Sequence, residues 1–472
     1  MGAPSRERSS FNTRQSSELT AKSTKEEAYS GNEFVMAGNE EAGRQVPPRD
    51  AGVVARRKGF ARTLGAFTVA IWILLAVVVC YIYGCVHNMN YRFHNFKILS
   101  VDFDNGIVGR SLQAAGKQLQ APTFPTVDVR PASEFPTEQS VRDAVCQGAY
   151  WGAIYSNVGA SERLASAISG ADAAYNPAAA LSWVWNGARY PAISTGAVQG
   201  GLQQIVAVSR LAYNAINGTA AVSALPANNA AVVNAVLNPI QGTQINIQPM
   251  NQGPRLFYNT VSLVFPIIIQ FFFLLGLNGL DMKFHVFSEL SFARNAVVRG
   301  ILSLFFTAVC GFILAGMIWG FEEDWKPSSG EYALTWLAFW MYMHINFLVM
   351  EVVLTFLQLP FPPFFILCWT IANVASGIAP FEVSNGFFKW GYALPGHEVY
   401  SVLIQIWSHG CVNRLYVALP VLFAWEVLMG PAAAYSLYTR CRDAKKTTSA
   451  MTDGKAPGAP GAPSGPPVPM GE

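Results

Sequence analysis

Residues 64–84 read LGAFTVAIWILLAVVVCYIYG and residues 264–277 read VFPIIIQFFFLLGL, and these two apolar stretches decide the fold. A helix that crosses a bilayer needs about 20 mainly apolar residues. Because neither stretch holds a charged residue, each predicts the apolar part of a membrane-spanning helix. The first is not a signal peptide, since 63 mostly polar residues precede it and it is too long for the apolar region of one.

Four further stretches have the same character, so we predict a polytopic α-helical membrane protein with six transmembrane helices. One helix stands alone near the beginning and five cluster in the second half of the chain. The predicted spans are Leu64–Gly84, Leu256–Leu277, Ala296–Gly320, Tyr332–Leu357, Phe361–Ala379 and Leu415–Tyr438.

The charge content agrees with a membrane protein. The chain has 61 charged residues among 472, or 13%, whereas soluble proteins average about 25%. The terminal segments 1–63 and 439–472 hold 19 and 8 of them, which leaves 34 for the middle 375 residues. So few charged residues cannot form the surface of a soluble globular protein of this length, which excludes a cytosolic enzyme. The net charge of +3 is too small to indicate a nucleic-acid partner.

Lys and Arg flank the spans on one side, which predicts that both termini are cytoplasmic. The chain then divides into a disordered cytoplasmic tail, a first span, an exoplasmic domain, a five-helix transmembrane domain and a disordered Pro/Gly-rich cytoplasmic tail. Their bounds are 1–63, 64–84, 85–255, 256–438 and 439–472.

The exoplasmic segment has the length of one domain, and its pattern predicts an α+β fold with a small sheet. Strands are expected at Lys97–Asp104, Thr126–Arg130 and Tyr150–Ser156. Helices are expected at Ile107–Leu119, Glu138–Gln147 and Ala160–Ser169, with one or two long helices within 196–237.

Three features on the exoplasmic side invite a functional interpretation. Asp102 and Asp104 lie on one face of a strand, where they bind a cation or a head group, or else cap the turn at Asn105-Gly106. Asn217 begins a glycosylation sequon. Cys146 and Cys411 both face the oxidising side in this topology and could pair, although no cysteine spacing suggests a disulfide scaffold or a zinc site.

Polar residues within the predicted spans are the first candidates for function, because such groups are costly in a membrane. These candidates are His344, Glu351, Glu426, Asn373 and Gln270. They either line a polar path or a groove for lipid head groups, or form hydrogen bonds between helices, which contribute about 0.6 kcal/mol each.

The connection between the second and third spans predicts a short amphipathic helix at the inner surface. Its apolar residues recur among charged ones at Phe284, Phe287, Leu290 and Phe292. This helix either receives a cytoplasmic partner or anchors the chain at the interface. On the outer side, the apolar segment Val399–Trp407 is expected to dip into the membrane or lie flat on it.

Motifs for catalysis are absent from the sequence. It holds no phosphate-binding GxxxxGK[ST], no HExxH, no GxSxG and no dinucleotide fingerprint, and its six His are dispersed. We therefore expect no enzymatic activity, no cofactor and no metal.

Three local motifs carry a resemblance to a family. They are VDFDN at 101–105, YWGAI at 150–154 and WGYALP at 390–395. Together with the order of one span, a large outside domain and five spans, they make residues 64–440 similar to the fungal nitrosoguanidine-resistance membrane proteins. The layout also resembles, more distantly, the membrane domains of type-2 ABC exporters and the phage-infection protein group.

This resemblance implies a plasma-membrane protein that confers resistance to toxic compounds. We expect a component for the export of lipids or amphipathic drugs, working as a homodimer in the lipid bilayer with a separate ATPase or another membrane protein as its partner. The alternative is a regulator or scaffold that moves no cargo and affects lipid organisation or other transporters.

Overall fold

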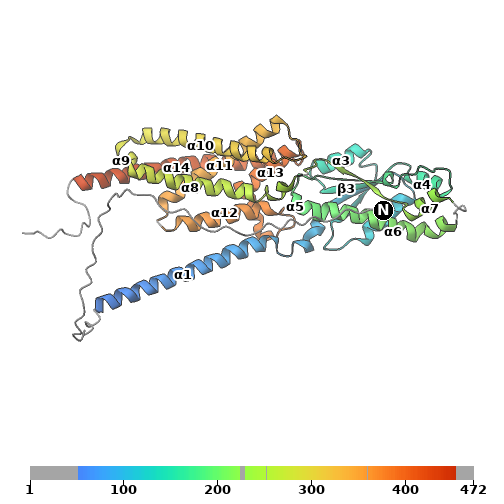
Figure 1. Cartoon of the computed structure of the whole chain (residues 1–472), viewed down its shortest axis with the longest axis horizontal. Helices are drawn as coiled ribbons and strands as arrows, with labels where there is room; N and C mark the ends of the chain where they lie inside the picture. Colours follow the sequence, from blue (N-terminus) through green and yellow to red (C-terminus); the bar gives the residue numbers. More distant parts are fainter. Residues whose placement is uncertain (1–50, 224–228, 251, 359, 453–472) are drawn as a thin grey trace, which may run out of the picture. The chain divides into compact units, whose positions relative to one another are not determined.

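The computed structural model describes residues 51–223, 229–250, 252–358 and 360–452 of the chain (Figure 1). The chain is mostly helical within these ranges and contains one five-stranded sheet. The described residues divide into two units, 51–66 and 67–452, and the sheet and the other helices belong to the second. We call residues 97–250 the sheet domain and residues 261–452 the helical bundle.

The sheet has the strand order β2-β1-β3-β4-β5. Its strands are β1 (Lys97–Asp102), β2 (Thr126–Arg130), β3 (Gly152–Ser156), β4 (Leu181–Trp185) and β5 (Gly242–Asn246). The helices of this domain are α2 (Ile107–Gln118), α3 (Glu138–Cys146), α4 (Ala160–Ile168), α5 (Pro191–Ser194), α6 (Gly200–Ser223) and α7 (Ala230–Leu237), with a π-helical turn at Thr195–Gln199.

Both faces of the sheet are covered, because side chains that alternate along each strand enter two different cores. On β1, Ile98 packs in the core that holds α2 and α6, while Leu99 packs with α3 on the other face. On β3, Ile154 and Tyr155 divide in the same way. This two-sided burial explains why β3 and β4 are buried along their whole length.

The structure confirms the three predicted strands, the three predicted short helices and the helices within 196–237. It corrects the α+β assignment, since three of the four strand pairings are parallel and helices connect the strands as in α/β folds. Only β3 and β4 pair antiparallel. Strands β4 and β5 were not predicted, because LSWVW and GTQIN show no alternation of apolar and polar residues. Their conformation depends on pairing with neighbouring strands of the sheet.

Asp102 and Asp104 cap the turn after β1. Asp102 Oδ1 accepts hydrogen bonds from the backbone N–H of Asp104 and Asn105, both at 3.0 Å, and from Ser156 Oγ at 2.6 Å. Asp104 accepts hydrogen bonds from the N–H and hydroxyl of Ser161. These contacts support the structural alternative for the pair over a cation site.

We expect Asp102→Ala to destabilise the sheet domain by about 3 kcal/mol, because the substitution leaves several donors of the turn between β1 and α2 without their acceptor. Thermal unfolding of the purified chain should show a lower midpoint. Asp143→Ala removes an exposed carboxylate from α3 and serves as the control. Equal midpoints for the two variants would show that the Asp102 contacts do not hold the turn.

The helical bundle contains α8 (Val261–Lys283), α10 (Phe292–Gly320), α11 (Ser329–Phe356), α12 (Pro362–Ile378), α13 (Pro395–Trp407) and α14 (Leu415–Thr452), and α1 (Ala51–Val86) precedes the sheet domain. Short helical segments connect them at Met89–Asn95, Pro177–Ala179, Gly253–Phe257, Val286–Glu289 (α9) and Gly386–Ala393 (η5).

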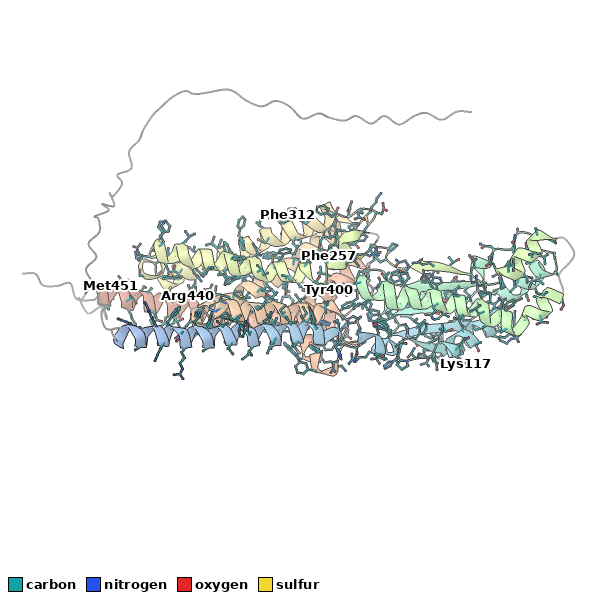
Figure 2. The ribbon with its side chains drawn as sticks, turned by 60° about the horizontal axis from the view of Figure 1, so that its bottom comes forward. Lys117, Phe257, Phe312, Tyr400, Arg440 and Met451 are labelled. Carbon is teal, nitrogen blue, oxygen red and sulfur yellow. A yellow bond between two sulfur atoms is a disulfide. The ribbon has the colours of Figure 1, made fainter. Side chains whose placement is uncertain are left out.

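Helix α11 is the centre of the bundle and packs against α8, α10, α13 and α14. The outer helices leave apolar side chains exposed, among them Phe312 on α10, which is 51% exposed and projects from the bundle (Figure 2). Exposed apolar surface of this extent is expected where helices meet lipid.

In the part of the chain that the structure describes, five helices are long and apolar enough to cross a membrane, namely α1, α8, α10, α11 and α14. Helix α12 is apolar but has 17 residues. The chain thus has the character of a polytopic helical membrane protein, while the sixth predicted crossing depends on α12.

The two tails that the sequence predicts as disordered are in part helical. Helix α1 begins at Ala51 and α14 continues to Thr452, so residues 51–63 and 439–452 are helical rather than disordered. A helix satisfies its backbone hydrogen bonds internally, and it can therefore continue beyond the apolar stretch that first defines it. The predictions for 1–50 and 453–472 lie outside the described residues.

A disulfide and polar contacts join the sheet domain to the bundle. Cys146 at the end of α3 is bonded to Cys411, which precedes α14. Asn186 Nδ2 donates a hydrogen bond to Ser408 Oγ at 3.1 Å, and the Val412 N–H donates to the carbonyl of Cys146 at 2.6 Å. The structure therefore forms the pair that the sequence left open.

Candidate functional site

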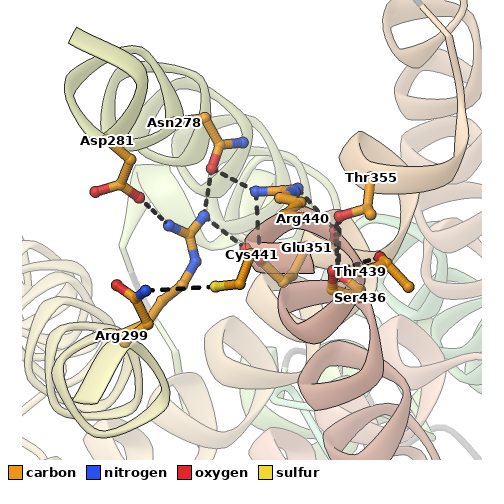
Figure 3. A network of polar contacts seen from close by, with 10 residues as sticks. Asn278, Asp281, Arg299, Glu351, Thr355, Ser436, Thr439, Arg440 and Cys441 are labelled. Carbon is orange, nitrogen blue, oxygen red and sulfur yellow. Dashed lines mark hydrogen bonds and ion pairs between the residues drawn. The ribbon is translucent and has the colours of Figure 1, made fainter. Parts of the chain in front are cut away.

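A network of charged side chains lies between four helices of the bundle (Figure 3). Arg299 of α10 reaches Asp281 and Asn278 of α8 through its guanidinium. The same group donates from Nη2 to Glu351 Oε2 of α11 at 2.8 Å. Arg299 and Glu351 are 7% and 2% exposed, so this ion pair is removed from solvent.

Arg440 of α14 completes the network. Its Nη1 donates to Asn278 Oδ1 at 2.6 Å and lies 3.4 Å from Glu351 Oε1, while Nη2 donates to the Glu351 carbonyl at 3.2 Å. Two arginines then face two carboxylates, those of Asp281 and Glu351, and the formal charge of the network is zero.

Hydroxyl groups and one aromatic ring surround these charges. Thr355 and Ser436 donate to the Glu351 carbonyl at 2.8 and 3.2 Å. The guanidinium carbons of Arg299 and Arg440 lie 5.7 and 5.9 Å from the ring centroid of Phe287. Such distances are typical of cation–π contacts, so Phe287 adds to the packing of both arginines.

This arrangement fixes the relative positions of α8, α10, α11 and α14. Each partner must remain in place, because a buried charge without its counter-ion is strongly destabilising. The hydrogen bonding is incomplete, because Arg299 Nε and Glu351 Oε1 are buried without a hydrogen-bond partner among the described residues, so we expect the network to specify one packing of the helices more than it raises their stability.

His344 and Glu426 form a second polar contact between helices. His344 Nδ1 of α11 lies 3.0 Å from Glu426 Oε2 of α14, and His344 Nε2 lies 3.4 Å from Ser303 Oγ of α10. His344 precedes Glu351 by two helical turns, so the two lie on one side of α11. The side chains of His344 and Glu426 are 18% and 22% exposed, and this pair is less enclosed than the arginine network.

The side-chain amides of Asn373 and Gln270 take no part in the arginine network or in the contact between His344 and Glu426. Asn373 of α12 accepts a hydrogen bond from the Gly396 N–H at 2.9 Å and donates to the Trp369 carbonyl, which secures the beginning of α13. Gln270 of α8 is fully buried, and neither of its side-chain polar atoms has a hydrogen-bond partner among the described residues. The five predicted residues therefore do not form one continuous polar path.

The connection between α8 and α10 differs from the predicted amphipathic helix. It forms one turn, α9, because α8 continues to Lys283 and α10 begins at Phe292. Phe287 is buried beneath the arginines, whereas Phe284 and Phe292 are 61% and 37% exposed and Leu290 is partly buried. Too few residues separate the two long helices for a further amphipathic helix.

The arginines are the site residues that sequence reasoning missed. In the sequence, Arg299 and Arg440 are interpreted as basic residues that flank the spans and set their orientation. In the structure, both side chains form ion pairs inside the bundle. One signal was available, since Arg299 lies seven residues inside α10 rather than at its end. An arginine so placed, opposite a spanning helix that carries a glutamate, indicates an ion pair.

Asn217 lies within α6 rather than in a loop, and its Nδ2 donates to the Tyr213 hydroxyl at 2.9 Å. Its glycosylation stays a prediction.

An apolar groove of about 420 Å³ lies among α11, α13 and α14. Its walls are aliphatic and comprise Leu334, Leu337, Ala338, Met341, Val402, Ile406, Leu415, Leu419 and Leu422. Leu334 and Leu337 are 52% and 46% exposed, so the groove opens to the outside of the bundle.

Polar groups gather at one part of this groove. His409 Nδ1 lies 2.8 Å from Glu331 Oε1. Gln405 also lines the groove, and its Oε1 is buried without a hydrogen-bond partner among the described residues. An aliphatic hollow of this size with a few polar groups has the character of a ligand site.

The family model described as "Protein of unknown function (DUF3533)" matches residues 67–430, which is about three quarters of the chain. The match extends from α1 into α14 and includes the sheet domain, the groove and all of the charged network except Arg440. No solved structure matches the chain. The resemblance to nitrosoguanidine-resistance proteins stays a prediction.

Proposed function

The chain belongs to this family of proteins of unknown function, and we propose that it is a membrane component for the export of lipids or amphipathic toxic compounds. The observation that carries this proposal is the apolar groove with its polar groups. A molecule with an apolar chain and a polar end can place the chain against the leucines of α11 and α14 and the polar end near Gln405 and His409.

We propose the following topology for this component. Helix α12 is the sixth crossing, both termini are cytoplasmic and the sheet domain is exoplasmic in the plasma membrane. The disulfide between Cys146 and Cys411 supports it, because disulfides persist on the oxidising side of a membrane and this topology places both cysteines there.

Export also needs a source of energy. The sequence has no ATP-binding motif, so we propose a separate ATPase or another membrane protein as the partner of a homodimer. The short connection around α9 exposes Phe284 beside Lys283, and it offers an apolar contact for such a partner at the end of the bundle that holds the arginine network.

Filling the groove tests the proposal. In cells that lack the endogenous protein, we expect a fluorescent amphipathic drug to accumulate and the wild-type chain to reduce it. Leu337→Trp should abolish most of this reduction, because an indole at a half-exposed position occupies the groove. Leu428→Trp, at a 65% exposed position of α14 that does not line the groove, is the matched control.

Two results would contradict the proposal. One is equal drug accumulation with and without the wild-type chain, and the other is full activity of Leu337→Trp at normal protein level. A regulator that moves no cargo is the second candidate, and the missing ATP-binding motif favours it. Reconstitution into vesicles separates the two, since a regulator translocates no fluorescent lipid even with the ATPase that copurifies.

A further inference from the structure

The polar part of the apolar groove contains a carboxylate and no strong cation. Its polar side chains are those of Glu331 at the start of α11, Gln405 of α13 and His409. Among the described residues that line the groove there is neither Lys nor Arg. The formal charge of this lining is −1 with a neutral His409 and zero with a protonated one. In neither state does the groove offer an anion an excess of positive charge.

The carboxylate of Glu331 is fixed through one of its two oxygens. Oε2 accepts hydrogen bonds from the Ser328 N–H at 2.6 Å and from the Ser328 hydroxyl at 3.0 Å, and the two residues form a capping box. Oε1 lies 2.8 Å from His409 Nδ1, but the two atoms are not aligned as a hydrogen bond. Oε1 is thus buried without a hydrogen-bond partner among the described residues, on a side chain that is 8% exposed. A ligand that donates to this oxygen removes the cost of leaving it unpaired.

Gln405 provides a second acceptor in the groove. Its Oε1 is also buried and without a hydrogen-bond partner in the described part of the chain. The unused oxygens of Glu331 and Gln405 can only accept hydrogen bonds. The polar end of a ligand that satisfies them must therefore be a donor.

Charges near the groove do not reverse its sign. Residues 322–326, which precede α11, read EEDWK and hold three acids against one Lys. Arg414 precedes Leu415 of the groove, but its guanidinium carbon lies 5.2 Å from the ring centroid of Tyr392. It also interacts with the carboxylate of Glu398, so its charge is engaged outside the groove.

The place of Glu331 in the bundle suits an amphiphile that enters from the lipid. Leu334 and Leu337 are half-exposed, so an alkyl chain can reach the groove from the side of the bundle. Glu331 lies in the first turn of an apolar helix of spanning length, where the end of the helix approaches the level of lipid head groups. A volume of about 420 Å³ lies within the usual range for small-molecule sites.

We propose that the groove selects an amphiphile whose polar end is an ammonium group, and that Glu331 sets this specificity. The alkyl chain lies against the leucines, and the N–H groups donate to Glu331 and Gln405. A hydrogen bond between an ammonium and a carboxylate is stronger than one between neutral groups. This inference rests on the proposed function, because it names the class of compound that the same groove takes.

Titration calorimetry on the purified full chain in phosphatidylcholine nanodiscs tests the specificity, with empty nanodiscs as the blank. The probes are decylamine, decyltrimethylammonium and decyl sulfate, which share one alkyl chain and differ in the head group. We expect decylamine to bind at least about tenfold more tightly than decyl sulfate, since a charge-assisted hydrogen bond separates them. Decyltrimethylammonium should bind with intermediate affinity, because it has the charge without an N–H. Equal affinity of the wild-type chain for decylamine and decyl sulfate would overturn the proposal.

Two variants test the role of Glu331. Glu331→Gln keeps an acceptor for the capping box and removes the charge, so the preference for decylamine over decyl sulfate should be lost. Asp324→Asn removes an exposed carboxylate that does not line the groove, and this variant should keep the preference. A Glu331→Gln variant that retains the preference of Asp324→Asn would overturn the assignment to Glu331.

Leu337→Trp separates a failure of this inference from a failure of the proposed function. If decylamine and decyl sulfate bind the wild-type chain equally and neither binds Leu337→Trp, the charge preference is wrong and the groove remains a ligand site. If none of the three probes shows saturable binding to the wild-type chain, the groove takes no amphiphile, which contradicts the proposed function together with this inference.

Discussion

Glu351→Ala will destabilise the bundle by about 3–5 kcal/mol, because it leaves Arg299 and Arg440 with one carboxylate, that of Asp281, between them. The glutamate is 2% exposed, so water cannot replace it without opening the helices. The measurement is thermal unfolding of the purified chain in detergent, together with the yield of monodisperse protein.

Two controls give this result its meaning. Glu426→Gln removes a charge from the partly exposed contact with His344 and should cost about 1 kcal/mol or less. The double substitution Arg299→Met with Glu351→Met leaves Asp281 and Arg440, one charge of each sign, and should be less harmful than Glu351→Ala, which leaves two arginines with one carboxylate. If Glu351→Ala unfolds like the wild-type chain, the network does not hold the helices together.

The second large effect concerns the disulfide. Replacing Cys146 and Cys411 with serine will lower the melting temperature of the chain, because the bond closes a loop with a sequence separation of 265 residues. The chain-entropy argument sets the loss at up to about 5 kcal/mol. Reducing the wild-type chain should reproduce the loss, and the reduced protein should differ from the oxidised one in gel mobility.

The position of Cys411 links this bond to the groove. Cys411 follows His409 and Gly410, which line the groove, so breaking the bond should also loosen its polar end. Cys368→Ser removes an exposed thiol of α12 and is the control. Mass spectrometry that finds both thiols free in the native protein would show that the pair does not form.

The long apolar helices and the first three strands could be predicted because their signals are local. An uninterrupted apolar stretch such as 64–84 has few alternatives to a spanning helix. The segment KILSVD places Ile98, Leu99 and Val101 close together, as expected for a short strand that is covered on both faces. Strand β5 carries no such signal, since its polar GTQIN becomes a strand through its pairing with β4.

The candidate sites were only partly predictable. Glu351, His344 and Glu426 stood out as charges at membrane depth, and the structure places each in a contact between helices. Their partners did not stand out, because Arg440 resembles any basic residue after a span. Arg189 and Glu382, which lie close together in the structure, come from two distant parts of the chain, and no spacing in the sequence connects them.

The sequence by itself determined the class of the protein, which is a chain with several apolar helices and one sheet domain between the first and the rest. Length and hydropathy suffice for this, because the backbone in a membrane has few conformations that satisfy its hydrogen bonds. The tertiary structure alone decided which charges are paired, which cysteines are joined and where the groove lies. These depend on side chains brought together over large sequence separations, such as Arg189 and Glu382, whose meeting is set by the packing of the whole unit.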